Sequence, residues 1–208
     1  MDRQCGRQPL ILAANPSLPA KTLLEFAEYA KAKPGTVPYG NLAIGGIAHL
    51  NMEALMRHLG IELLQIPYKG AAPALSALLA GEVMVSLTSL TAALPMVREG
   101  RLRGFAVGLD KRFTQLPDVP TCVEAGGGAN TIVPTYFGLA GPAGMPQPVL
   151  DKLAAALKHA LDTPEVAGKI LESGCVPALT SPADLAATMT SDVAHFAKLV
   201  KAAGITPQ

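Results

Sequence analysis

The sequence predicts an α/β fold, and three observations carry that prediction. Short apolar or β-rich segments recur along the chain, helical segments with recognisable caps follow them, and glycine or proline separates the two. Strands that alternate with helices in this way favour parallel sheets. The chain has 208 residues, which is enough to bury a core in one large domain or in two small lobes.

The first predicted elements are a buried strand and a capped helix. Residues 10–14 are wholly apolar and Pro16 follows soon after, which favours a strand over a helix. Thr22 and Glu25 form a capping box that predicts the start of a helix, and Pro34 marks its end.

The middle of the chain repeats one unit, which consists of a strand, a loop and a helix. The predicted strands are residues 37–39, 63–67, 83–87 and 102–107. The predicted helices are residues 47–59, residues 73–80 and a short stretch that ends at Gly100. Gly60 and Gly81 stand where glycine is favoured after a helix, and Pro73 suits a first helical turn.

The last part of the chain is predicted to hold a strand at 136–141 and three helices. Residues 148–161 form the first helix, Thr163-Pro164 opens the second and Ser181 opens the third. Apolar residues recur every three or four positions on the third helix and predict a stripe that faces the core: Leu185, Met189, Val193, Phe196 and Val200. We assign these helices to packing rather than to function.

Composition and motifs exclude several classes of function. Half of the residues are hydrophobic, 16% are charged and the formal net charge is +1, so neither disorder nor electrostatic binding of nucleic acid is indicated. The four histidines lack metal-ligand spacing, and no nucleotide-binding or nucleophile motif occurs, which argues against a metal, a cofactor and an enzyme. The three cysteines are interpreted as free thiols, and Gly126-Gly127-Gly128 as a flexible turn.

Three loops at the C-terminal ends of predicted strands are the candidate binding segments: residues 40–46, 68–72 and 87–90. Such loops line the ligand crevice of open α/β sheets, and here each leads into a helix N-terminus. Unpaired amides and the positive end of a helix dipole suit a carboxylate without a lysine or arginine clamp. Other interpretations remain open, since loop glycines also serve ordinary turns, Tyr68 and Lys69 are common surface residues, and Tyr136 and Phe137 would ordinarily lie in the core.

Several segments resemble a known family in order and spacing from about residue 10 to 205. They are Asn15-Pro16-Ser17-Leu18-Pro19, Ala30-Lys31-Ala32-Lys33-Pro34-Gly35, Tyr39-Gly40 through to His49-Leu50, Pro67-Tyr68-Lys69-Gly70 with Pro73-Ala74-Leu75, Leu116-Pro117-Asp118-Val119-Pro120-Thr121 with Glu124-Ala125-Gly126, Phe137-Gly138-Leu139 and Val200-Lys201-Ala202-Ala203-Gly204-Ile205. Each segment is weak alone, but the set is specific. It resembles the Bug-type solute receptors of tripartite tricarboxylate transporters.

The resemblance implies a type-2 periplasmic-binding-protein fold, with two lobes and two crossover strands, that closes over a small organic anion. On that template residues 1–15 are a remnant of lobe 1 with the first crossover (10–14), 16–104 form lobe 2, and 105–208 hold the second crossover (105–107) and the rest of lobe 1. The ligand-binding residues that it implies are Tyr39, Gly40, Asn41, Gly45, Gly46, Thr88, Ser89, Tyr136 and Phe137. The implied partners are a small carboxylate and the membrane components of the transporter, in the periplasm, without nucleic acid or membrane insertion.

The chain departs from the family pattern in two ways. It lacks the N-terminal part in which receptors carry an export signal and part of lobe 1, so we expect an incomplete first lobe, and a cytoplasmic location if this is the full gene product. In residues 40–46 apolar side chains replace hydroxyl groups, and Thr88 stands in place of a common acidic residue. These changes favour a carboxylate with an apolar body and no amino group. The alternative hypothesis is a truncated, binding-deficient or partner-dependent fragment of a receptor.

Overall fold

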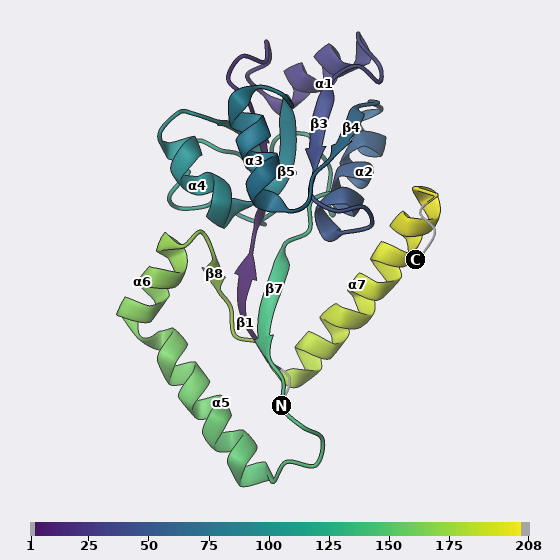
Figure 1. Cartoon of the computed structure of the whole chain (residues 1–208). Helices are drawn as coiled ribbons and strands as arrows, with labels where there is room; N and C mark the ends of the chain where they lie inside the picture. Colours follow the sequence, from purple (N-terminus) through teal and green to yellow (C-terminus); the bar gives the residue numbers. More distant parts are fainter. Residues whose placement is uncertain (1–2, 205–208) are drawn as a thin grey trace. The chain divides into compact units, whose positions relative to one another are not determined.

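The computed structural model describes residues 3–204 and divides into two compact units (Figure 1). Unit 1 comprises Met1–Gln8 and Thr135–Lys198, and unit 2 comprises Pro9–Pro134 and Leu199–Gln208. The chain therefore passes between the units after residues 8, 134 and 198. Ile205, the last residue of the family resemblance, lies outside the described residues.

Unit 2 contains a five-stranded sheet with the order β4-β3-β5-β2-β6. Its strands are β2 (Leu10–Ala14), β3 (Pro38–Asn41), β4 (Leu64–Pro67), β5 (Val85–Ser89) and β6 (Arg103–Val107). β3 runs parallel to β4 and β5, whereas β2 runs antiparallel to β5 and β6. The prediction of parallel strands therefore holds for the four strands that helices connect and is wrong for β2. No single helix joins β2 to either of its sheet neighbours, so no crossover sets its direction.

Helices cover both faces of this sheet. α1 (Leu23–Lys31) and α2 (Ile47–Leu59) share one apolar cluster with Leu12 of β2, and α3 (Ala71–Ala80) shares another with Ala13. Since side chains alternate along a strand, β2 contributes residues to both clusters and is buried throughout. α4 (Leu90–Arg98) packs against the second cluster through Met96 and Val97.

The caps predicted from the sequence are present in unit 2. The Thr22 hydroxyl accepts a hydrogen bond from the Glu25 amide at 3.2 Å. The Glu25 carboxylate accepts from the Lys21 amide rather than from Thr22, so the capping box closes one residue earlier than usual. Gly60 and Gly81 have φ of 64° and 78°, the left-handed conformation that follows many helices.

The triple glycine is a packed turn, so its interpretation as a flexible turn was wrong. A Cβ atom on Gly127 would lie 2.5 Å from the Cys122 sulfur, and one on Gly128 would lie 2.6 Å from the His58 ring. Gly126 would meet Leu24 at 2.9 Å. Glycine is required here because the turn lies directly against α1 and α2.

Unit 1 contains a three-stranded antiparallel sheet with the order β7-β1-β8. Its strands are β1 (Arg3–Gln8), β7 (Thr135–Leu139) and β8 (Val176–Pro177). Its helices are α5 (Gln147–Asp162), α6 (Pro164–Glu172) and α7 (Pro182–Ala202). α7 continues into unit 2, where the Arg57 guanidinium donates to the Ala202 carbonyl and caps the last helical turn.

The expected core-facing stripe of α7 is only partly buried, because Met189 and Val193 are exposed while Phe196 and Val200 are half-buried, so that prediction was wrong for two of its five residues. Leu185 is buried, but Met189 is 50% exposed and Val193 is 71% exposed. α5 and α6 contain no buried residue at all. The periodicity of these helices is amphipathic as predicted, but the small sheet of unit 1 offers too little surface to cover their apolar faces.

The two strands expected to cross between lobes, β2 and β6, pair with each other inside the sheet of unit 2. The boundaries drawn at residues 16 and 104 also fall inside unit 2, which runs to Pro134. Among residues 3–204, none of the helices combines the length and the apolar character that a membrane span requires.

Candidate functional site

The parallel strands β4, β3 and β5 bring three of their loops to one edge of the unit 2 sheet. The Tyr68 amide donates to the Asn41 carbonyl at 2.8 Å, and the Gly70 amide donates to the Leu42 carbonyl at 3.3 Å. Gly40 of β3 is paired with Ser86 of β5, which places Asn41 and Thr88 one and two residues beyond a paired position. The structure therefore brings Asn41, Thr88 and the start of α2 to the same edge of the sheet.

The N-terminus of α2 presents amides without helical partners. Its first helical hydrogen bond runs from the Leu50 amide to the Gly46 carbonyl, so the amides of residues 47–49 precede the helical ladder. Gly46 caps the helix without a side chain, and the first turn holds no acidic residue that would neutralise the dipole. This end of α2 can therefore receive an anion.

The other two helix ends at this edge are less open. The first turn of α3 includes Pro73, which has no amide hydrogen to offer. At α4, the Leu90 amide donates to the Pro9 carbonyl at 2.8 Å, and the Ala92 amide donates to the Ser89 hydroxyl at 3.4 Å. Ser89 is therefore the N-cap of α4.

Two buried polar side chains at the sheet edge lack hydrogen-bond partners for one atom each. Asn41 is 2% exposed and its Nδ2 has no partner, although its Oδ1 accepts from the Ala43 amide at 3.4 Å. Thr88 is 1% exposed and its hydroxyl has no partner. An unpaired buried donor costs about 1–3 kcal/mol, which a ligand atom or a water at this edge would recover.

Tyr39 and Gly40 lie deeper than the loop that follows them. The Tyr39 ring belongs to the apolar cluster under α1 and α2, and burial, followed by the nearby Glu53 carboxylate, raises the pKa of its hydroxyl far above the usual value. The Gly40 carbonyl accepts from the Ser86 hydroxyl at 2.9 Å. Both residues belong to β3, the strand that leads into the loop before α2.

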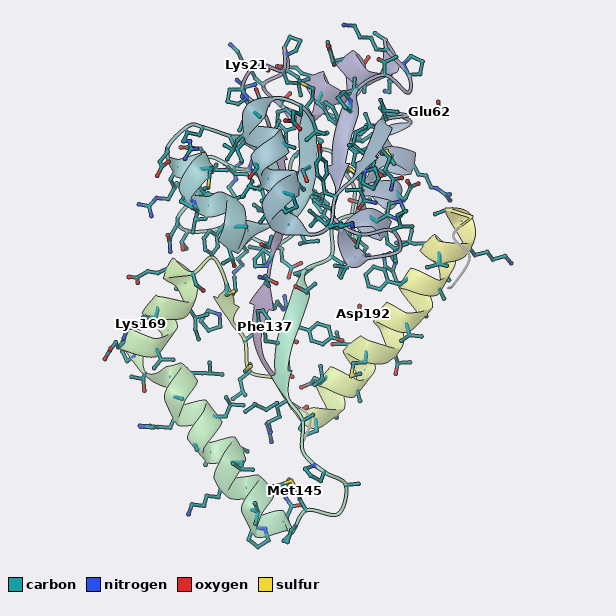
Figure 2. The ribbon with its side chains drawn as sticks, in the orientation of Figure 1. Lys21, Glu62, Phe137, Met145, Lys169 and Asp192 are labelled. Carbon is teal, nitrogen blue, oxygen red and sulfur yellow. The ribbon has the colours of Figure 1, made fainter. Side chains whose placement is uncertain are left out.

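Tyr136 and Phe137 belong to β7 of unit 1. Tyr136 is half-buried opposite Arg7, and burial, followed by the Asp192 carboxylate, raises the pKa of its hydroxyl. The Phe137 ring is exposed, and its carbonyl accepts from the Cys5 thiol at 3.4 Å (Figure 2).

Sequence reasoning missed two buried polar residues of α2. Nδ1 of His49 accepts from the Gly45 amide at 3.0 Å, and the side chain of Asn51 donates to the Val133 carbonyl at 2.9 Å. The sequence shows the spacing of four residues from Gly45 to His49, but this spacing also fits ordinary helix periodicity. Only the fold of the loop shows that the Gly45 amide and the His49 ring meet. No group of three or more metal-ligating side chains occurs in the part of the chain that the structure describes.

Solved structures of similar overall fold are periplasmic binding proteins. The structure described as R. palustris Rpa4515 with adipate aligns over the whole chain and 71% of its own length, with a TM-score of 0.85 and 30% identity. Periplasmic binding protein BugD aligns over 99% of this chain and 69% of its own, with a TM-score of 0.81 and 32% identity. MatC from Rhodopseudomonas palustris with bound malate gives a TM-score of 0.78 at 28% identity, over 95% of this chain and 68% of its own. The α/β fold is therefore that of a periplasmic binding protein.

Sequence relatives point the same way. A UPF0065 protein of Bordetella pertussis is 33% identical over 96% of this chain and 62% of its own length, and Protein BugT of the same organism is 30% identical over 96% and 61%. The chain thus spans about three fifths of the length of these relatives. A family profile described as "Tripartite tricarboxylate transporter family receptor" matches residues 3–205. Since that match covers nearly every residue, the chain belongs to the tripartite tricarboxylate transporter receptor family, which is a family of receptors rather than enzymes.

Proposed function

We propose that the chain captures a small organic carboxylate for a tripartite transporter, in the periplasm, and that unit 2 supplies the anion site. The observation that carries this proposal is the uncapped N-terminus of α2 beside two buried donors without partners, Asn41 Nδ2 and the Thr88 hydroxyl. Amides and hydroxyl groups hold a carboxylate without a charged clamp. Similar proteins described with adipate and with malate support this class of ligand.

The side chains of the loop favour a ligand with an apolar body. Leu42 and Ile44 stand in the loop between β3 and α2, and Ile44 is exposed. Thr88 offers a hydroxyl where a carboxylate would be needed to pair an ammonium group. We therefore propose a carboxylate without an amino group. Tyr136 and Phe137, on unit 1, stay predictions from the family resemblance.

A thermal-shift panel with matched ligands tests this proposal. Adipate, 2-aminoadipate and galactarate have the same chain length but differ in an amino group or in hydroxyl groups. A ligand at about 100 times its Kd should stabilise the folded protein by about 2.7 kcal/mol, which raises the Tm by about 5–10 °C for a chain of this size. We expect adipate to give the largest shift. If none of these ligands, nor malate or citrate, changes the Tm, carboxylate capture is excluded.

A second candidate function is that of a fragment that acts only with a partner. The observation that favours it is the uncovered apolar surface of unit 1, where α5 and α6 contain no buried residue. Exposed apolar surface of this kind promotes self-association. Light scattering after size exclusion, together with binding of a hydrophobic dye, distinguishes the candidates, because a monodisperse monomer that binds no dye contradicts the second.

A further inference from the structure

His49 is the third residue of α2 and is almost wholly enclosed, at 5% exposure. Its Nδ1 accepts the hydrogen bond from the Gly45 amide at 3.0 Å, and a ring nitrogen that accepts carries no proton. The proton of the neutral ring is therefore on Nε2, which lies 3.7 Å from the Glu53 carboxylate one turn further along the helix. The environment thus selects one tautomer.

This bond determines which amides are left for a ligand. The Gly45 amide is occupied by His49, and the Gly46 amide donates to the Ala43 carbonyl at 3.1 Å. Gly45 has φ of 75°, a conformation that turns the loop back toward the helix. The Gly45 and Gly46 amides are thereby satisfied within the loop and α2, and the amides of residues 47–49 precede the helical ladder.

The His49 bond is also the shortest of three hydrogen bonds that tie residues 42–45 to β3, to α2 and to the loop before α3. The other two are the bond from the Ala43 amide to Asn41 Oδ1, at 3.4 Å, and the bond from the Gly70 amide to the Leu42 carbonyl, at 3.3 Å. Loss of the His49 bond would leave residues 42–45 with the two longer bonds to these segments.

We infer that His49 is a positioning residue of the carboxylate site, which acts through Nδ1 by holding the Gly45 amide and so fixing the loop in front of α2. The inference rests on the proposed function for its effect on binding. The hydrogen bond itself and the tautomer are tested separately, without any ligand.

Three substitutions separate the two nitrogens of the ring. The amide oxygen of asparagine reaches the place of Nδ1, so His49→Asn keeps an acceptor for the Gly45 amide. The longer side chain of glutamine reaches the place of Nε2, so His49→Gln keeps only the group that faces Glu53. His49→Leu keeps neither. His58→Leu is the matched control, because His58 lies on the same helix but contacts the Gly126 carbonyl instead.

The ligand-free test uses nuclear magnetic resonance of the whole chain. The ¹⁵N shifts of the His49 ring should show Nδ1 without and Nε2 with a proton, and the Gly45 amide should exchange about fivefold to tenfold faster in His49→Gln and His49→Leu than in wild type or His49→Asn. A protonated Nδ1, or equal exchange in all variants, overturns the inference whether or not any ligand binds.

The binding test uses adipate and isothermal titration calorimetry. We expect Kd to rise about fivefold to tenfold in His49→Gln and His49→Leu, and to stay within about twofold in His49→Asn and in His58→Leu. If His49→Gln binds as wild type does and His49→Asn does not, the Glu53 side of the ring is the important one and the inference is wrong. If wild type binds none of the carboxylates, the proposed function fails, while the ligand-free test still decides the role of Nδ1.

Discussion

Asn41 and Thr88 hold polar atoms that the folded chain encloses without pairing. Such atoms lower the stability of the ligand-free protein, and they remain useful where a ligand can reach them. Both residues follow paired positions of adjacent strands at the edge where α2 begins. At the scale of single residues, the proposed site thus consists of groups that stabilise the fold little and that would stabilise a bound anion more.

Replacement of Thr88 by valine should separate stability from binding. Valine has the same shape but no hydroxyl, so we expect Thr88→Val to raise the free energy of unfolding by about 1 kcal/mol and to weaken carboxylate binding. Ser86→Ala is the control on the same strand, because the Ser86 hydroxyl is paired with the Gly40 carbonyl and its loss should destabilise by about 1 kcal/mol. Urea unfolding and calorimetry measure the two effects, and a destabilised Thr88→Val contradicts the assignment.

Two carboxylates of α7 should respond to pH with opposite signs. Burial raises the pKa of Asp192, although His195 lowers it in part, so this group costs stability once pH rises above its folded pKa. Asp192→Asn should therefore stabilise the chain at pH 7, and the gain should vanish at about pH 3, where the aspartate is protonated in both states. Thermal unfolding from pH 3 to 8 tests this, and a loss of stability at pH 7 is the contrary result.

Asp184 is the matched comparison for Asp192. Hydrogen bonds from the Ser181 hydroxyl at 2.6 Å and amide at 3.2 Å lower the pKa of Asp184. The stability from these bonds is present above the unfolded pKa and disappears as pH falls through the lower folded pKa. Asp184→Asn should thus destabilise the chain at pH 7 and matter little in strong acid.

At the scale of elements, glycines have different surroundings in the two units. Gly127 lies where α1 and α2 meet the packed turn, with the Leu23 and Leu55 side chains 3.0 and 3.1 Å from the place of a Cβ atom. Gly168 lies in α6 with no atom within 4 Å of such a position. The same residue type therefore reports close packing in unit 2 and an open helix surface in unit 1.

Substitution of these two glycines by alanine should have opposite effects. Gly127→Ala forces a methyl group against Cys122, Leu23 and Leu55, and we expect a loss of about 1–3 kcal/mol. Gly168→Ala adds helix propensity without a clash and should gain about 0.5–1 kcal/mol. Denaturant titration of both variants tests the packing, and a neutral Gly127→Ala would show that the turn yields easily.

At the scale of the whole molecule, the two units differ in how well they cover their apolar residues. Unit 2 encloses β2 between helices on both faces, whereas α5 and α6 of unit 1 contain no buried residue. Stability is therefore expected to be uneven along the chain, since exposed helices open locally at low cost.

Hydrogen exchange measured by mass spectrometry should show this difference. Amides of α5 and α6 should exchange at least about a hundredfold faster than those of α2, because opening them exposes no buried side chain. Equal protection in a dilute sample would mean that something covers these helices, and its loss on further dilution would identify a second copy of the chain.

Local signals sufficed wherever a few adjacent residues decide the structure. The limits of α2 follow from its apolar periodicity and from Gly60, and the loops of the site follow from strands that end before helices. β1 could not be predicted, because its sequence Arg-Gln-Cys-Gly-Arg-Gln has no apolar pattern and becomes a strand only by pairing with β7 and β8. The exposure of Met189 and Val193 was equally hidden, since periodicity says which face of a helix is apolar but not whether anything covers it.

The sequence by itself determined the family, the α/β class and the set of loops that meet at one sheet edge. Only the tertiary structure decided which amides of those loops are already bonded. At the start of α4 the amides donate to the Pro9 carbonyl and the Ser89 hydroxyl, and the Gly45 amide donates to His49, whereas the amides of residues 47–49 at the start of α2 precede the helical ladder. The reason is physical, because propensities and caps act within a few residues, whereas the pairing and burial of a polar group depend on the segments that the fold brings beside it.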